Sequence, residues 1–190
     1  MGKLVVTEFI SIDGVIEDPG GAEDFAHGGW VFQFERGEEG NKFKLDEVLE
    51  AEAQLLGRVT YEGFAAAWPS RTDEAGFAER MNAMPKYVVS KMLQSAEWNN
   101  TTVLRGDLAD EVAPLKEQYA GDILVAGSAQ LVQSLLAADL VDELHLMVFP
   151  VFLGRGKRLF ADETSPQRFT LAGVRQTAEV AILTLRREGG

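Results

Sequence analysis

Residues 122–146 read DILVAGSAQLVQSLLAADLVDELHL, and this stretch decides the fold class. An apolar run over Asp122–Gly127 predicts a buried strand, and Ala129–Ala138 carries its apolar residues at helical spacing. A second apolar run, Asp142–Pro150, predicts another strand. A strand, a helix and a strand in this order are typical of parallel strands joined by a helical crossover.

The same alternation continues toward the N-terminus. Strands are predicted at Leu4–Ile12, Ala53–Gly57, Lys86–Ser90 and Thr101–Leu104, and helices at Lys42–Ala51, Thr60–Trp68, Glu74–Met84 and Leu108–Tyr119. Pro114 should break or kink the last of these helices. Toward the C-terminus, Arg168–Thr177 and Glu179–Glu188 predict two strands that pair antiparallel. We therefore expect an α/β fold with a mainly parallel central sheet, antiparallel C-terminal edge strands and helices on both faces, as a single domain over residues 1–190.

Residues 17–41, EDPGGAEDFAHGGWVFQFERGEEGN, carry six glycines and one proline and predict a long irregular loop. A loop of this length in a compact domain indicates function or disorder, and its aromatic residues indicate that it packs against another part of the protein or a ligand. The loop is either a cover over the core or a lid over a substrate. Trp30 and Phe34 are accordingly candidates for stacking on a flat heterocycle or for core packing.

Composition narrows the function classes. The chain has 190 residues, 46% of them hydrophobic, and a net charge of −12, which argues against a nucleic-acid partner. It has no cysteine, and His27 and His145 match no metal-ligand spacing, so no metal site is expected. No apolar run is long enough to span a bilayer, and no membrane partner is expected. We expect a cytoplasmic protein.

Four joints that follow predicted strands share a chemical theme. Each combines a small or hydroxyl residue with a cation or a glycine, at residues 57–60, 90–91, 105–106 and 127–129. A helix N-terminus offers unpaired amides, a glycine lets an anion approach the backbone, and arginine fits a phosphate. Together these joints predict a dinucleotide with an additional phosphate, such as NADPH. Taken singly, each joint is more often a turn or a helix cap than a ligand contact, and the set is more informative than its members.

Two further polar residues stand out. Asp13 follows the first strand and is a candidate proton donor, together with the carboxylates of residues 35–50, although Asp-Gly is also a turn signal. His145 alternates with Leu144 and Leu146 on a predicted strand, which favours a wall or interface position over catalysis.

Five motifs, in this order, carry a family resemblance: SIDG at 11–14, LLGRVTYE at 55–62, YVVSK at 87–91, the stretch 122–146, and FPVFLGRGKRLF at 149–160. The chain resembles the dihydrofolate reductase-like superfamily, and within it the C-terminal reductase domain of the riboflavin-biosynthesis deaminase/reductase. The resemblance implies a three-layer fold and NADPH as cofactor.

Carried over by position, the resemblance implies four groups of cofactor contacts. Val15 and Ile16 would close over the nicotinamide ribose, and Gly57, Arg58 and Thr60 would bind the pyrophosphate and the adenosine phosphate. Ser90 and Lys91 would meet the 2'-phosphate and ribose. The glycine turn and helix start under the nicotinamide and diphosphate would be Gly127, Ser128, Ala129, Gln130 and Leu131.

The sequence departs from the family pattern at two places. The glycine turn has Ser128 where the family commonly has a second glycine, and no carboxylate of residues 35–50 aligns with the pterin-binding acid of dihydrofolate reductases. We expect an NADPH-dependent reductase that acts on a small heterocyclic or carbonyl/imine substrate, similar to 5-amino-6-(5-phosphoribosylamino)uracil reductase. The alternative is a catalytically degenerate nucleotide-binding or regulatory module on the same fold. The resemblance also implies a homodimer formed through strands near the C-terminus.

Overall fold

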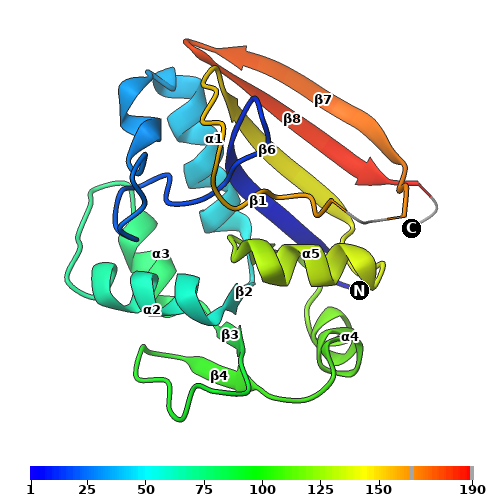
Figure 1. The fold of residues 1–190 in the computed structure, drawn as a ribbon. Coiled ribbons are helices and arrows are strands. Elements are labelled where there is room, and N and C mark those ends of the chain that lie inside the picture. The colour runs from blue at the N-terminus through cyan, green and yellow to red at the C-terminus, as the bar shows by residue number, and fades with distance from the viewer. Residues whose placement is uncertain (163–164, 189–190) are drawn as a thin grey trace.

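The protein is built on one eight-stranded sheet with the strand order β4-β3-β2-β5-β1-β6-β8-β7 (Figure 1). The structure is a computed structural model, and it describes residues 1–162 and 165–188. The strands are β1 (Leu4–Ser11), β2 (Ala53–Gly57), β3 (Lys86–Val89), β4 (Thr101–Leu104), β5 (Ile123–Val125), β6 (Glu143–Phe149), β7 (Phe169–Thr177) and β8 (Val180–Arg187). All pairs from β4 to β6 are parallel, and β6-β8 and β8-β7 are antiparallel. The predicted sheet is confirmed.

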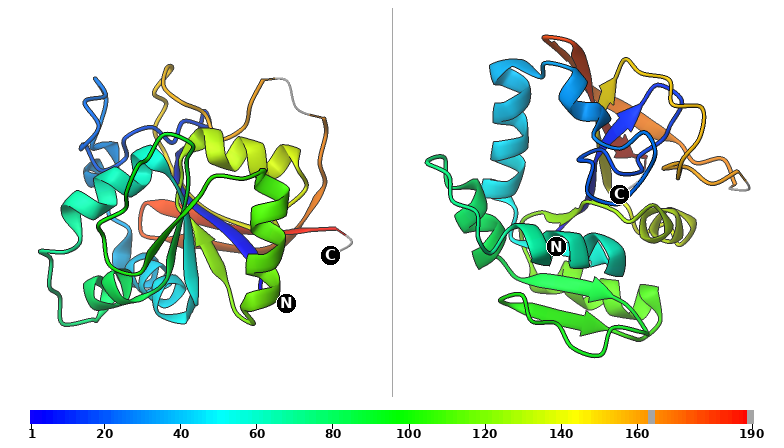
Figure 2. Two further views of the ribbon diagram at one scale, coloured as in Figure 1. Left: turned by 90° about the horizontal axis from the view of Figure 1, so that it is seen from below. Right: turned by 60° about the vertical axis from the view of Figure 1, so that its left-hand side comes forward.

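Helices cover both faces of the sheet (Figures 1 and 2). They are α1 (Gly37–Glu50), α2 (Arg58–Ala67), α3 (Phe77–Ala83), α4 (Leu108–Gln118) and α5 (Ala129–Ala137). Apolar residues of α4 and α5 pack with Leu4, Val6 and Ile10 on one face. Residues of α1, α2 and α3 pack with Val5 and Leu56 on the other. Within residues 1–162 and 165–188, no helix is long and apolar enough to cross a membrane.

Two predicted local features differ in the structure. The irregular loop predicted for residues 17–41 ends earlier, because the 3-10 helix η1 (Trp30–Gln33) and the first turn of α1 lie inside it. Trp30 is fully buried beside Phe149, so its packing holds this segment in a defined conformation. Of the break or kink predicted at Pro114, the break is absent, since α4 continues through this residue and the nearby Val112 and Leu115 pack into the core. The kink stays a prediction.

The direction of the chain connections places a topological switch point beside β5. β1 pairs with β5 over Leu4–Val6 alone, whereas it pairs with β6 as far as Ser11. The chain leaves β1 toward α1 on one face and leaves β5 toward α5 on the opposite face. Open α/β sheets bind ligands at the carboxyl ends of strands whose connections depart to opposite faces. We call this end of β1 and β5 the crevice.

Candidate functional site

The joints after β2 and β5 touch each other at this crevice. The amide of Gly57 donates to the carbonyl of Gly127 at 3.2 Å. A Cβ atom added to Gly57 would stand 2.4 Å from Ser128 Oγ, so this contact leaves no room for a side chain. Gly127 has φ +82°, and a Cβ there would stand 3.0 Å from Thr60 Oγ1. The structure thus brings together four of the predicted residues where two backbone segments meet. Gly57 and Gly127 are buried there, and Ser128 and Thr60 are partly exposed.

The helices that begin at these joints have unsatisfied first turns. Neither α2 nor α5 has a side-chain cap, and neither has an acidic residue in its first turn. By contrast, Asp107 caps α4, and the Asp73 carboxylate accepts from the first amides of α3. In a chain with 30 acidic residues, α2 and α5 are the two described α-helices without an acid in the first turn. Both ends therefore present free amides and a positive dipole end to the crevice.

Residues of the α5 start divide between the site and the core. Ala129, Gln130 and Leu131 form the first turn of α5 after Ser128. Gln130 is exposed, whereas Leu131 packs into the core beneath the helix. The predicted contacts at this helix start would therefore come from backbone amides and from Ser128 more than from the Leu131 side chain.

Cations flank the crevice on the β3 side. Gly57 pairs with Val89, so Ser90 and Lys91 follow directly beside the start of α2. Ser90 Oγ accepts from two amides of its own turn, at 3.1 and 3.0 Å, which is the capping role considered for it, and Lys91 is exposed. Arg58 forms an ion pair with Glu62 one turn along α2, at 2.8 Å, with side chains that are 39% and 47% exposed. An exposed pair of this kind is weak enough for a phosphate to replace it.

The loop after β1 is held by its own hydrogen bonds. The Val15 amide donates to Ser11 Oγ at 2.9 Å, and Ile16 packs into the core cluster that also contains residues of β1 and α5. The Asp13 carboxylate accepts from the Ser11 hydroxyl and from the amides of Leu153 and Gly154. Burial raises the pKa of Asp13, but these hydrogen bonds outweigh it and hold the pKa below its usual value. These contacts describe a turn residue, and its catalytic role stays a prediction.

The two predicted stacking residues lie in an aromatic cluster. The Trp30 indole donates to the Glu17 carbonyl at 3.0 Å and packs edge-on against Phe149. Phe34 also packs edge-on against Phe149 and is partly exposed. Core packing, the alternative considered for both, describes these contacts, and substrate stacking stays a prediction.

A residue that the sequence analysis did not select, Glu8, faces the same crevice. It lies on β1 between the inward-facing residues Val6 and Ile10 and is 8% exposed. Burial raises the pKa of Glu8 to about 8, against the opposing effects of Lys44 and of the Gly127 amide. Its Oε1 atom is buried without a hydrogen-bond partner. The available signal was one charged residue inside the otherwise uncharged strand LVVTEFIS.

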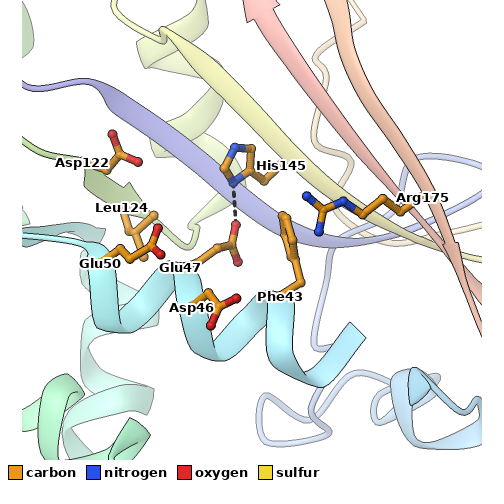
Figure 3. A pocket seen from close by; sticks show the side chains of 8 residues that line it. All are labelled: Phe43, Asp46, Glu47, Glu50, Asp122, Leu124, His145 and Arg175. Atoms are coloured by element: carbon orange, nitrogen blue, oxygen red, sulfur yellow. Dashed lines mark hydrogen bonds and ion pairs between the residues drawn. The ribbon is translucent and has the colours of Figure 1, made fainter. Parts of the chain in front are cut away.

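A second buried carboxylate, Glu47, lies on the other face of the sheet and is fully paired. It accepts from His145 Nδ1 at 2.6 Å (Figure 3). It also accepts from the Thr7 hydroxyl at 2.9 Å and forms an ion pair with Lys44 at 3.0 Å. Burial alone raises the pKa of Glu47, but Lys44 and His145 together hold it below its usual value. We name Thr7, Lys44, Glu47 and His145 the α1 charge cluster. His145 thus lies on a wall of the sheet, as predicted from its alternation.

This cluster borders a pocket between α1 and the sheet (Figure 3). The lining residues are Phe43, Asp46, Glu47, Glu50, Asp122, Leu124, His145 and Arg175. Asp122 directly precedes β5, so this part of the lining lies at the amino end of that strand, whereas the crevice lies at its carboxyl end. Among residues 1–162 and 165–188, no group of three or more His, Cys, Asp or Glu side chains could hold a metal ion. Because they lie at opposite ends of β5, the pocket and the crevice are separate features.

The strand order, the two-faced helix cover and the antiparallel edge define the dihydrofolate reductase-like class of α/β proteins. Residues 2–183 match the family model for the RibD C-terminal domain, and the chain belongs to that family. It is 29% identical over 181 residues to the uncharacterized protein YwjB of Bacillus subtilis (strain 168), covering 95% of each chain. It is 26% identical over 163 residues to YyaP of the same organism, also uncharacterized, with 84% of this chain and 81% of YyaP covered.

Solved structures show the same fold. A protein of Shewanella sp. PV-4, provisionally named for riboflavin biosynthesis, superposes with a TM-score of 0.73 at 22% identity, covering 98% of this chain and 99% of that one. RibD of Acinetobacter baumannii gives a TM-score of 0.68 at 17% identity, with 98% of this chain and 58% of RibD covered. At these identities the likeness establishes the fold, and the activity has to be argued from the site.

Proposed function

We propose that this protein is an NADPH-dependent reductase that acts on a small heterocyclic, carbonyl or imine substrate. The observation that carries the proposal is the meeting of two uncapped, acid-free helix N-termini at the crevice beside β5. Free amides, glycine backbone and flanking cations are what a dinucleotide with three phosphate groups requires. Family membership supports the same conclusion.

The residues present fit this cofactor. Because Gly57 and Gly127 lack side chains, the two joints pack closely and bring the uncapped first turns of α2 and α5 together, and the amides of these turns would bind a diphosphate. Ser128 and Thr60 add hydroxyl donors at the same place. Arg58 and Lys91 would hold the adenosine phosphate, and Val15 and Ile16 would cover the ribose on the nicotinamide side. When bound, the cofactor would supply a hydride, and these residues would orient it and exclude water.

The test of cofactor binding is a fluorescence titration with NADPH and with NADH. We expect NADPH to bind more tightly, and Arg58→Ala to weaken NADPH binding roughly 10- to 100-fold while NADH binding changes little, since a charged hydrogen bond is lost. Arg168→Ala is the matched control. Like Arg58, Arg168 is an exposed arginine paired with a glutamate, Glu188, but it belongs to none of the joints at the crevice. If neither dinucleotide binds at submillimolar concentration, the proposed function is wrong.

Turnover separates a reductase from the degenerate binding module. We expect NADPH oxidation, followed by absorbance, with at least one member of a panel of pteridines, pyrimidines and small carbonyl compounds. Binding of NADPH without oxidation across that panel would favour a regulatory module on the same fold.

The homodimer is proposed on the apolar face of the C-terminal strands. Leu171 and Val174 of the edge strand β7 are 57% and 59% exposed, and they lie opposite Leu185 and Leu183 of β8. Exposed apolar residues along an edge strand are typical of an interaction surface. Light scattering measures the oligomeric state. We expect a dimer for the wild type and a monomer for Leu171→Lys, and a monomeric wild type would refute the proposed dimer.

A further inference from the structure

Glu8 is a buried acid with one carboxyl oxygen, Oε1, that has no hydrogen-bond partner. Within residues 1–162 and 165–188, three buried side-chain atoms lack a hydrogen-bond partner, and Glu8 Oε1 is the one that belongs to a carboxyl group. A buried polar group without a partner costs stability, so such groups point to a ligand or to a functional requirement. A structural acid at similar depth, such as Glu47, has donors for its oxygens.

The position of Glu8 connects it to the proposed cofactor site. A Cβ on Gly127 would stand 3.7 Å from Glu8 Oε1 and 3.0 Å from Thr60 Oγ1, so both polar groups border the same piece of backbone. Glu8 also lies two residues beyond Val6, where β1 and β5 cease to pair and the crevice begins. The unpartnered oxygen is therefore at the switch point where a ligand of this fold enters.

We propose that Glu8 is a catalytic residue of this reductase. Its carboxyl group lies against the nicotinamide ring of the cofactor and gives its proton to the substrate as that ring becomes cationic. The inference rests on the proposed function and adds the proton source to it. Asp13 is less suited to this role, because three donors stabilise its charged form. Glu47 is excluded by its place on the opposite face of the sheet.

The chemical step balances without a further reactant. The electrophilic carbon of a C=N or C=O group accepts a hydride and its electron pair from C4 of the dihydronicotinamide, and a C–H bond forms. The π pair of the double bond moves to the heteroatom, which takes the proton of Glu8. The substrate gains two electrons and NADPH loses two. Glu8 ends as a carboxylate beside the cationic ring, and solvent returns its proton after NADP⁺ leaves.

Charge complementarity explains why a neutral carboxyl belongs here. The protonated carboxyl group of Glu8 is uncharged and suits the neutral nicotinamide ring of NADPH. Its carboxylate form carries a negative charge and pairs with the cationic ring of NADP⁺. The other charged groups that act on Glu8 are Lys44 of α1, which favours the carboxylate, and Glu23 of the preceding loop, which opposes it. The oxidised cofactor would add the missing positive charge at close range.

Proton release on binding tests the proposal without turnover. Titration calorimetry of NADP⁺ and of NADPH at about pH 7, in phosphate and in imidazole buffer, gives the number of protons exchanged. We expect about one proton released with NADP⁺ and close to none with NADPH, because the two ligands differ in the charge of the ring. At pH values below the pKa of Glu8, the affinity for NADP⁺ relative to NADPH should increase about tenfold for each unit by which the pH is raised. The 2'-phosphate is common to both ligands and cancels in this comparison.

Two variants assign the proton. Glu8→Gln should bind both ligands and release no proton with NADP⁺, whereas Glu23→Gln should behave as the wild type. Glu23 is the proper control because burial raises its pKa as well and it is electrostatically coupled to Glu8. Should Glu8→Gln fold poorly, an infrared difference spectrum of the wild type gives the same answer, since NADP⁺ should remove one protonated carboxyl band.

The outcomes distinguish the two levels of inference. Binding of both ligands with equal proton counts, or proton release that persists in Glu8→Gln, would overturn the role of Glu8 and leave the reductase proposal standing. Absence of binding by both ligands would refute the reductase proposal and the role of Glu8 with it.

Discussion

Two buried glutamates on opposite faces of one sheet show how differently the same side chain behaves in this protein. Glu8 and Glu47 are both shielded from water, yet the pKa of Glu8 is raised to about 8 and that of Glu47 is lowered. Glu47 has Lys44, His145 and Thr7 as partners, whereas Oε1 of Glu8 has none. Partners, and not depth of burial alone, decide the charge of a buried acid.

The largest effect is expected in the pH dependence of stability. The pKa of Glu8 is about 8 in the folded protein, against its ordinary value of 4.5 in the unfolded chain. The stability that the protonated Glu8 contributes is therefore complete below about pH 4.5 and is lost as the pH rises toward 8. Glu8→Gln cannot ionise. Its free energy of unfolding should therefore rise relative to wild type by on the order of 4 kcal/mol across this window. Urea denaturation at a series of pH values measures it, and parallel pH profiles would show that Glu8 is not buried as described.

Removal of Glu47 should produce the next largest effect. Glu47→Ala leaves Lys44 and His145, with side chains 15% and 14% exposed, without their shared partner. We expect a loss of roughly 3 kcal/mol in the free energy of unfolding at neutral pH. The loss should shrink as the pH falls below about 4.5, because the pKa of Glu47 is lowered and its stabilising charge disappears in acid.

The control for this variant is Glu62→Ala, which breaks the exposed pair with Arg58. It should change the free energy of unfolding by no more than about 0.5 kcal/mol. Equal losses for the two variants, measured by urea denaturation, would mean that the α1 charge cluster is no more than a set of surface pairs.

The smallest effect concerns the hydroxyl inside the cluster. Thr7→Val keeps the shape of the side chain but removes the hydrogen bond to Glu47 and the acceptor for Lys44. A loss of about 1 kcal/mol is expected by thermal or urea unfolding. Thr170→Val is the matched control, because the Thr170 hydroxyl makes one exposed contact with Glu188 at 3.4 Å. If the two substitutions have the same effect, the Thr7 hydroxyl adds nothing to the pairing of Glu47.

Much of the fold could be predicted because its signals are local. The stretch 122–146 became β5, α5 and β6 with shifts of one or two residues at the ends. The main error, the loop predicted for residues 17–41, arose because glycines conceal a helix start that tertiary packing stabilises. The four joints with phosphate-binding residue types could also be recognised in the sequence, since a glycine, a hydroxyl residue or a cation directly follows each of these predicted strands.

The sequence by itself determined the succession of strands and helices along the chain, the class of the sheet and the residue types at the joints that follow the strands. Only the tertiary structure decided which buried acid is paired. The partners of Glu47 lie 40 and 98 residues away, at Thr7 and His145. Glu8 meets Gly127 because β1 and β5 are neighbours in the sheet. The charge of a buried group depends on neighbours that folding brings together, and no local pattern contains them.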